Sequence, residues 1–106
     1  MAEDPFYLKC CATGERGTRG DPVEWHHNLI FAGRQVQEAF AILPIKRSLH
    51  AQAHLPEVKD QLDWIMLSRA SQEQLDRYSK AIDLRARLAT LEDYFGEYSP
   101  QETPAW

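Results

Sequence analysis

The stretch WHHNLIFAGRQVQEAFAILPIKRSLHAQAH, residues 25–54, contains all four histidines of the 106-residue chain. They form two pairs: His26 and His27 are adjacent, and His50 and His54 are four residues apart. Residues four apart on a helix lie on one face, so two imidazoles at that spacing can bind the same ion. Because histidine is the commonest metal ligand among side chains, the two pairs predict a site for one divalent cation.

The segments around the first pair have the composition of short strands joined by loops. Aromatic and apolar residues favour extended structure, and glycine-rich stretches favour loops. An ideal strand would send His26 and His27 to opposite faces, so both reach one site only if the strand bends or bulges there. The expected strands are residues 6–11, 23–31 and 40–45, and residues 32–34 end the second of them. Pro44 requires an edge position in the third strand. Residues 14–22 are the expected loop.

Helical patterns dominate the second half of the chain. Residues 47–55 predict a short helix that carries His50 and His54, and Pro56 favours a new helix start. Apolar residues at helical spacing predict a helix over 57–69. Ser71 and Gln74 form a capping-box pattern that opens a third, longer helix to Phe95, and Gly96 suits its C-terminal cap. Residues 97–106 predict an irregular tail.

Length and composition favour one small domain of the α+β class. Apolar residues make up 43% of the chain, the net charge is −4, and no apolar run approaches the roughly 20 residues that span a membrane. The N-terminus lacks a signal-peptide pattern, so we expect a cytoplasmic protein, or one in a host cytoplasm. Cys10 and Cys11 point to opposite faces of an extended segment, which disfavours a disulfide between them and predicts reduced thiols.

Charge is distributed unevenly between the two halves. Residues 1–56 balance their basic and acidic side chains, and the acidic excess lies in residues 57–106. A divalent cation bound in the first half would make that half positive. We therefore expect a nucleic acid to approach from the histidine side rather than from the helices.

The order of a strand with His-His, a returning strand and a helix with His-x3-His resembles the ββα-metal finger of HNH endonucleases. That family includes the colicin nuclease domains and many phage nucleases. The phrases Trp25-His26-His27, Phe31-Ala32-Gly33-Arg34 and Ala41-Ile42-Leu43-Pro44-Ile45 resemble its phage-borne branch. The resemblance covers residues 6–56 and implies a finger with an N-terminal strand. It does not extend to residues 57–96, where the apolar spacing predicts a helical hairpin.

The resemblance also implies roles for the histidines. His26, His50 and His54 would bind one divalent ion (Mg, Mn, Ni or Zn), and His27 would be the general base that activates water. The chain departs from the family at the middle asparagine, whose position is occupied by Ala41. Lys46 and Leu49 occupy the usual positions of the second cysteine pair of a structural zinc site, so we expect no structural zinc.

Other side chains near the motif have two interpretations each. Arg34 or Arg47 could stabilise charge on a scissile phosphate, and Arg16, Arg19 and Lys46 could contact a nucleic-acid backbone, although each is also an ordinary surface charge. Glu24 could orient an imidazole or be an exposed strand residue. Trp25 is expected to pack in the core.

Three functions compete at this stage. The first is a metal-dependent endonuclease acting on double-stranded DNA, with a homodimer through the C-terminal helices as a further possibility. The second is a catalytically weak or inactive module, stabilised by metal, that binds DNA or protein. The third is a helical interaction protein whose histidines are incidental.

Overall fold

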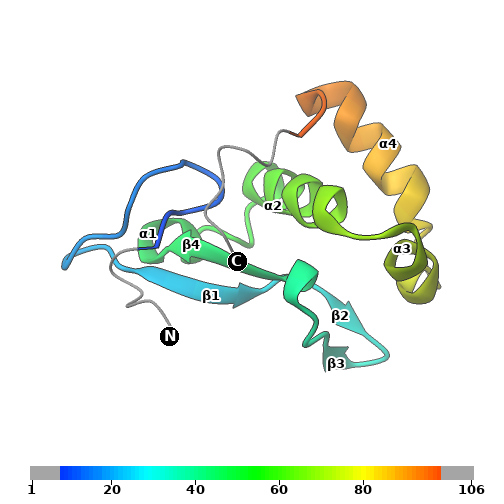
Figure 1. Cartoon of the computed structure of the whole chain (residues 1–106), viewed down its shortest axis with the longest axis horizontal. Helices are drawn as coiled ribbons and strands as arrows, with labels where there is room; N and C mark the ends of the chain where they lie inside the picture. Colours follow the sequence, from blue (N-terminus) through cyan, green and yellow to red (C-terminus); the bar gives the residue numbers. More distant parts are fainter. Residues whose placement is uncertain (1–7, 99–106) are drawn as a thin grey trace.

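The computed structural model describes residues 8–98, which combine two small antiparallel sheets with helices in an α+β fold (Figure 1). The expected α+β class is therefore confirmed. β1 pairs with β4, and β2 pairs with β3. In chain order the elements are β1 (Val23–His27), β2 (Ile30–Phe31), β3 (Arg34–Gln35), a 3-10 turn η2 (Ala39–Ala41), β4 (Ile42–Lys46), α1 (Arg47–His50), α2 (Pro56–Arg69), α3 (Gln72–Tyr78) and α4 (Leu84–Phe95).

The first histidine pair lies at the end of a strand that is shorter than expected. β1 ends at His27 instead of continuing through residue 31, and β2 is a separate element. The residue opposite Asn28 is Ala41, whose carbonyl accepts a hydrogen bond from the Asn28 amide at 2.8 Å. Ala41 belongs to the 3-10 turn, so the partner strand begins only at Ile42 and regular pairing stops.

The break at residues 32–34 is a tight hairpin between β2 and β3. Ala32 and Gly33 have φ angles of 53° and 78°. Positive φ at both central residues defines the turn whose twist suits a two-residue hairpin, and glycine adopts it without steric cost.

Residues 8–11 do not form the expected N-terminal strand. Lys9 makes one isolated bridge with Arg16. The Cys10 amide donates to the Glu15 carbonyl and the Gly14 amide donates to the Cys10 carbonyl, so the chain forms a tight turn here. The strand prediction is thus wrong for this part, and Phe6 and Tyr7 lie outside the described residues. The expected loop is confirmed, because residues 14–22 contain no helix and no strand beyond that bridge.

The helix that carries the second histidine pair is also shorter than expected. α1 ends at His50, and the chain continues through bonds from the amides of Gln52 and Ala53 to carbonyls three residues earlier. Such bonds wind the backbone at three residues per turn rather than 3.6. His54 therefore lies in a turn and is rotated away from the helical position above His50.

The prediction of one long third helix is wrong, because residues 71–95 form two helices. The capping box is confirmed, with the Ser71 hydroxyl accepting from the Gln74 amide, but α3 ends at Tyr78. The Ser79 hydroxyl then donates to Leu75 and accepts from the Leu84 amide. Asp83 caps α4 by accepting from two amides of its first turn, and Gly96 with φ of 88° ends it as expected.

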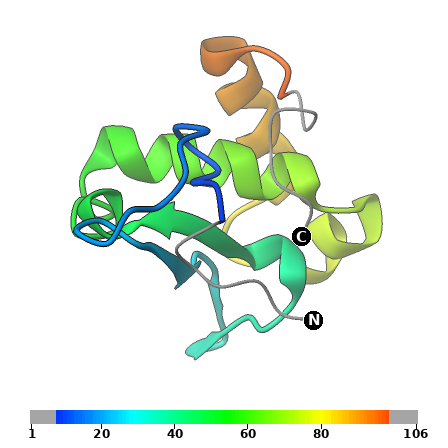
Figure 2. The ribbon, with the colours of Figure 1, turned by 60° about the vertical axis from the view of Figure 1, so that its left-hand side comes forward.

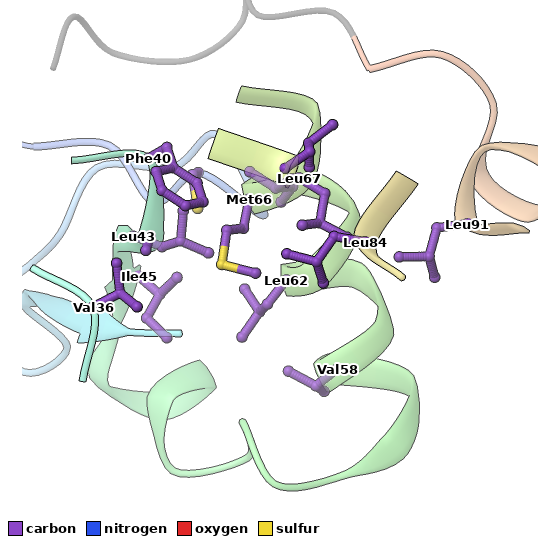
Figure 3. Close-up of a cluster of buried hydrophobic side chains, with 14 of the residues drawn as sticks. Val36, Phe40, Leu43, Ile45, Val58, Leu62, Met66, Leu67, Leu84 and Leu91 are labelled. Atoms are coloured by element: carbon purple, nitrogen blue, oxygen red, sulfur yellow. The ribbon is translucent and has the colours of Figure 1, made fainter. Parts of the chain in front are cut away.

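α2 lies between the β1–β4 sheet and α4, as the two views show (Figures 1 and 2). Leu43 and Ile45 on the inner face of β4 and Leu62 of α2 are fully buried (Figure 3). The same cluster of buried side chains continues to Leu91 of α4. Full burial of one such side chain contributes roughly 1.5–3 kcal/mol, so the β1–β4 sheet and the helices stabilise each other through one shared core.

Trp25 does not pack in that core. Its side chain is 45% exposed, because alternation along β1 places it on the face opposite Glu24 and His26. Among residues 8–98, no helix is long and apolar enough to cross a membrane.

Candidate metal and nucleic-acid site

All four histidines line one cleft of about 710 Å³. β1 supplies His26 and His27, α1 supplies His50, and the following turn supplies His54. Apolar lining comes from α2, from the start of α4 and from the loop between α3 and α4, and includes Met66, Leu67, Ile82 and Leu84. The two histidine pairs thus lie along the same cleft.

The rings of His26 and His50 are in direct contact, with centroids 4.9 Å apart and planes at 65°. This contact follows from the topology. β4 pairs antiparallel with β1 and runs directly into α1, which brings the start of the helix back onto β1. Glu24 and His26, two residues apart, share the face of β1 that meets α1.

Glu24 connects β1 to α1. Its Oε1 accepts a hydrogen bond from Nδ1 of His50 at 3.0 Å, and its Oε2 accepts one from Nε of Arg47 at 3.0 Å. The bonds from His50 and Arg47 hold the pKa of the Glu24 carboxyl below its ordinary value, so it is ionised at neutral pH. The imidazole-orienting interpretation of Glu24 is thus confirmed as a contact.

A second chain of polar contacts begins at His26. Its Nε2 lies 3.0 Å from Oδ1 of Asn28, whose Nδ2 donates to Oδ1 of Asp63 at 2.9 Å. Asp63 also binds Lys59 and, at 3.2 Å, Arg87. Burial, above all, lowers the pKa of His26 from 6.5, which favours the neutral ring that a metal ligand requires.

Asn28 and Asp63 were missed by reasoning from sequence. They are 35 residues apart, and only packing of α2 against the end of β1 brings them together. The four-residue spacing of Lys59 and Asp63 on α2 was the one local signal available.

His27 and His54 occupy the rim of the cleft. The His27 side chain is half-buried at the end of β1, with Nε2 3.2 Å from Oε1 of Gln37. His54 is exposed. The expected bend or bulge between the two β1 histidines is not present, because β1 pairs with β4 in unbroken register from Val23 to His27, and both side chains line the cleft at the end of that strand.

The cleft lining, within the described part of the chain, includes none of the five basic residues singled out from the sequence. Arg34 is exposed near the tip of the β2–β3 hairpin, and Arg16 and Arg19 lie in the 14–22 loop. Lys46 pairs with Glu15 at 2.9 Å, and Arg47 pairs with Glu24. The cations that do line the cleft are Lys59 and Arg87, both bound to Asp63.

Within residues 8–98, no three side chains of the His, Cys, Asp or Glu type are already arranged to hold a metal ion. His26 and His50 are adjacent, but His54 lies in the 3-10 turn beyond α1. The chemistry of the set still fits a divalent cation of the zinc or nickel type, which binds imidazole nitrogen.

No protein-family model matches this chain, and neither a curated protein nor a solved structure matches it.

Proposed function

We propose that this protein is a metal-dependent DNA endonuclease of the HNH type. The observation that supports the proposal most directly is the meeting of all four histidines in one cleft, with the His26 and His50 rings 4.9 Å apart. In this proposal β1, β4 and α1 form the ββα-metal finger, and the helices α2 to α4 cover it. Double-stranded DNA is the proposed substrate and the cytoplasm, including a host cytoplasm, the proposed location.

His26, His50 and His54 would hold the cation. A divalent ion bound there supplies positive charge to the phosphoryl and leaving oxygens of a phosphodiester. Glu24 fixes the orientation of His50 through its bond to Nδ1, which leaves Nε2 as the free ring atom. Partners of this kind typically raise metal affinity by holding the ligand in position.

His27 is the proposed general base. A neutral imidazole can take the proton of the attacking water. The water oxygen forms the new bond to phosphorus as the bond to the leaving oxygen breaks, and the proton passes to His27. Gln37, 3.2 Å from Nε2, would hold the ring in place.

Positive side chains would bind the DNA backbone around the cleft. Lys59 and Arg87 line it, and Arg47 lies beside it on α1. Arg16, Arg19 and Lys46 remain proposed contacts to the DNA backbone, and Arg34 and Arg47 remain the proposed stabilisers of charge on the scissile phosphate. A homodimer through α3 and α4 would present two sites to two strands, and a monomeric mass by light scattering at high concentration would remove that possibility.

A second candidate function is a metal-stabilised binding module without catalysis. The observation that favours it is the pairing of both cleft cations, Lys59 and Arg87, with Asp63. This pairing reduces the positive potential available to a phosphate. The module would show a metal-dependent rise in Tm and no cleavage with any ion.

Metal titration and plasmid cleavage test both functions together. We expect the parent protein to bind one divalent ion and to cut plasmid, His27→Ala to bind metal but not cut, and His26→Ala and His50→Ala to lose metal binding. Gln52→Ala, an exposed residue in the turn after α1, is the matched control and should behave as the parent. Full cleavage by His27→Ala would show that His27 is not the base, and undiminished metal binding by His26→Ala would refute the cation site.

A further inference from the structure

A buried chain of three side chains connects α2 to the first histidine of the cleft. Asn28 is 6% exposed and Asp63 is 8% exposed. The carboxamide of Asn28 lies between the side chains of Asp63 and His26. Its Nδ2 is 2.9 Å from Asp63, and its Oδ1 is 3.0 Å from His26. Asp63 is held in turn by Lys59 and Arg87. Buried polar groups of this kind keep their partners, because losing one costs the full desolvation penalty.

The direction of each hydrogen bond in this chain is determined by chemistry. An ionised carboxylate can only accept, so the Asn28 group facing Asp63 must be the NH₂ that donates. The carboxamide oxygen therefore faces His26, and it carries no hydrogen. In the neutral ring the hydrogen of this contact must then come from Nε2 of His26, which leaves Nδ1 with the free lone pair.

His50 has the opposite arrangement. Glu24 also only accepts, so Nδ1 of His50 carries the hydrogen and Nε2 holds the lone pair. The two touching rings are thus fixed in different tautomers by partners from different elements. Glu24 acts from β1, and Asp63 acts from α2 through Asn28.

We propose that Asn28 and Asp63 are positioning residues that fix His26 in the Nε2–H tautomer and so present Nδ1 as its ligand atom. Ala41, which occupies the position of the family's asparagine, gives Asn28 only a backbone carbonyl, at 2.8 Å. In this chain the carboxamide beside the histidines is that of Asn28, and Asp63 of α2 orients it. The use of Nδ1 as a ligand rests on the proposed metal site, whereas the tautomer itself does not.

Histidine ring NMR tests the tautomer directly. The full chain, labelled with ¹⁵N-histidine and free of metal, is measured at a pH where the rings are neutral. We expect His26 to show a protonated Nε2 and an unprotonated Nδ1, and His50 to show the reverse. A His26 ring protonated on Nδ1 would overturn the proposal, and this measurement needs no variant to fold.

Asp63→Asn tests the role of the helix. An asparagine at position 63 can both donate and accept, so it no longer dictates the orientation of the Asn28 carboxamide. We expect a mixture of His26 tautomers and a fall in affinity for Zn²⁺ or Ni²⁺ of about tenfold or more, as for other residues that orient metal ligands. Asp60→Asn is the matched control on the same helix, since Asp60 binds Arg87 and not Asn28, and it should leave the His26 tautomer unchanged.

The two readouts separate this proposal from the proposed function. An Nε2–H His26 that becomes mixed in Asp63→Asn supports the positioning chain even if no ion binds, in which case only the metal site fails. An unchanged tautomer in a folded Asp63→Asn variant overturns the role of Asp63.

Discussion

Oε1 of Glu24 lies 3.0 Å from Nδ1 of His50, although the two residues are 26 positions apart in the sequence. The contact joins β1 to α1, the helix that follows β4. It leaves one nitrogen of His50 free, and the other oxygen of the carboxylate binds Arg47. In the proposed metal site, Glu24 would hold the imidazole of His50 in position for the ion.

We therefore expect Glu24→Gln to weaken binding of Zn²⁺ or Ni²⁺ by about tenfold, the lower end of the usual range for a residue that orients a ligand. A neutral amide can offer either an acceptor or a donor to His50, so it holds the ring less firmly. Isothermal titration calorimetry measures the affinity. Glu15→Gln, which removes the exposed ion pair to Lys46, is the control, and equal affinities for the two variants would contradict the expectation.

Gln37→Ala should affect cleavage and spare metal binding. Gln37 contacts His27, the proposed base, and none of the proposed metal ligands in the described structure. Loss of this partner leaves His27 free to sample unproductive orientations, so we expect a fall in cleavage rate of about tenfold, a part of the 10²–10⁴ that general-base catalysis supplies. Plasmid nicking and calorimetry on the same samples separate the two effects, with Gln35→Ala on β3 as the control.

The metal-free protein should lose stability as the pH falls below 6.5. Burial lowers the pKa of His26 in the folded state, so between pH 6.5 and that lower value the unfolded chain binds more protons than the folded one. Stability therefore rises with pH across this window and is fully present above it. Thermal unfolding with a chelator measures the slope, and His26→Gln should flatten it. An identical pH dependence of Tm in both proteins would argue against a buried neutral His26.

Asp83→Ala should destabilise the fold by about 1 kcal/mol, the typical value for loss of an N-cap. The Asp83 carboxylate accepts from the amides of Arg85 and Ala86 at the start of α4. Asp93→Ala, an exposed position later in the same helix, should change stability far less. Chemical denaturation of both variants gives the difference, and a single transition is expected because the core is shared between the sheet and the helices.

Local patterns predicted the elements whose signals lie within a few residues. The start of α2 at Pro56, the capping box at Ser71 and the glycine after Phe95 were all expected, because each depends on hydrogen bonds or dihedral angles of neighbouring residues. Asp83 carries an equally local signal, but continuous apolar spacing across residues 79–83 obscured it.

The sequence by itself determined the grouping of four histidines into two pairs, the α+β class and the helix that begins at Pro56. Only the tertiary structure decided where β1 and α1 end, why Trp25 is exposed, and that Asp63 reaches His26 through Asn28. The physical reason is the separation along the sequence between the residues that determine each feature. Caps and turns are set by adjacent residues, whereas strand ends, burial and buried hydrogen bonds depend on which distant segments pack together.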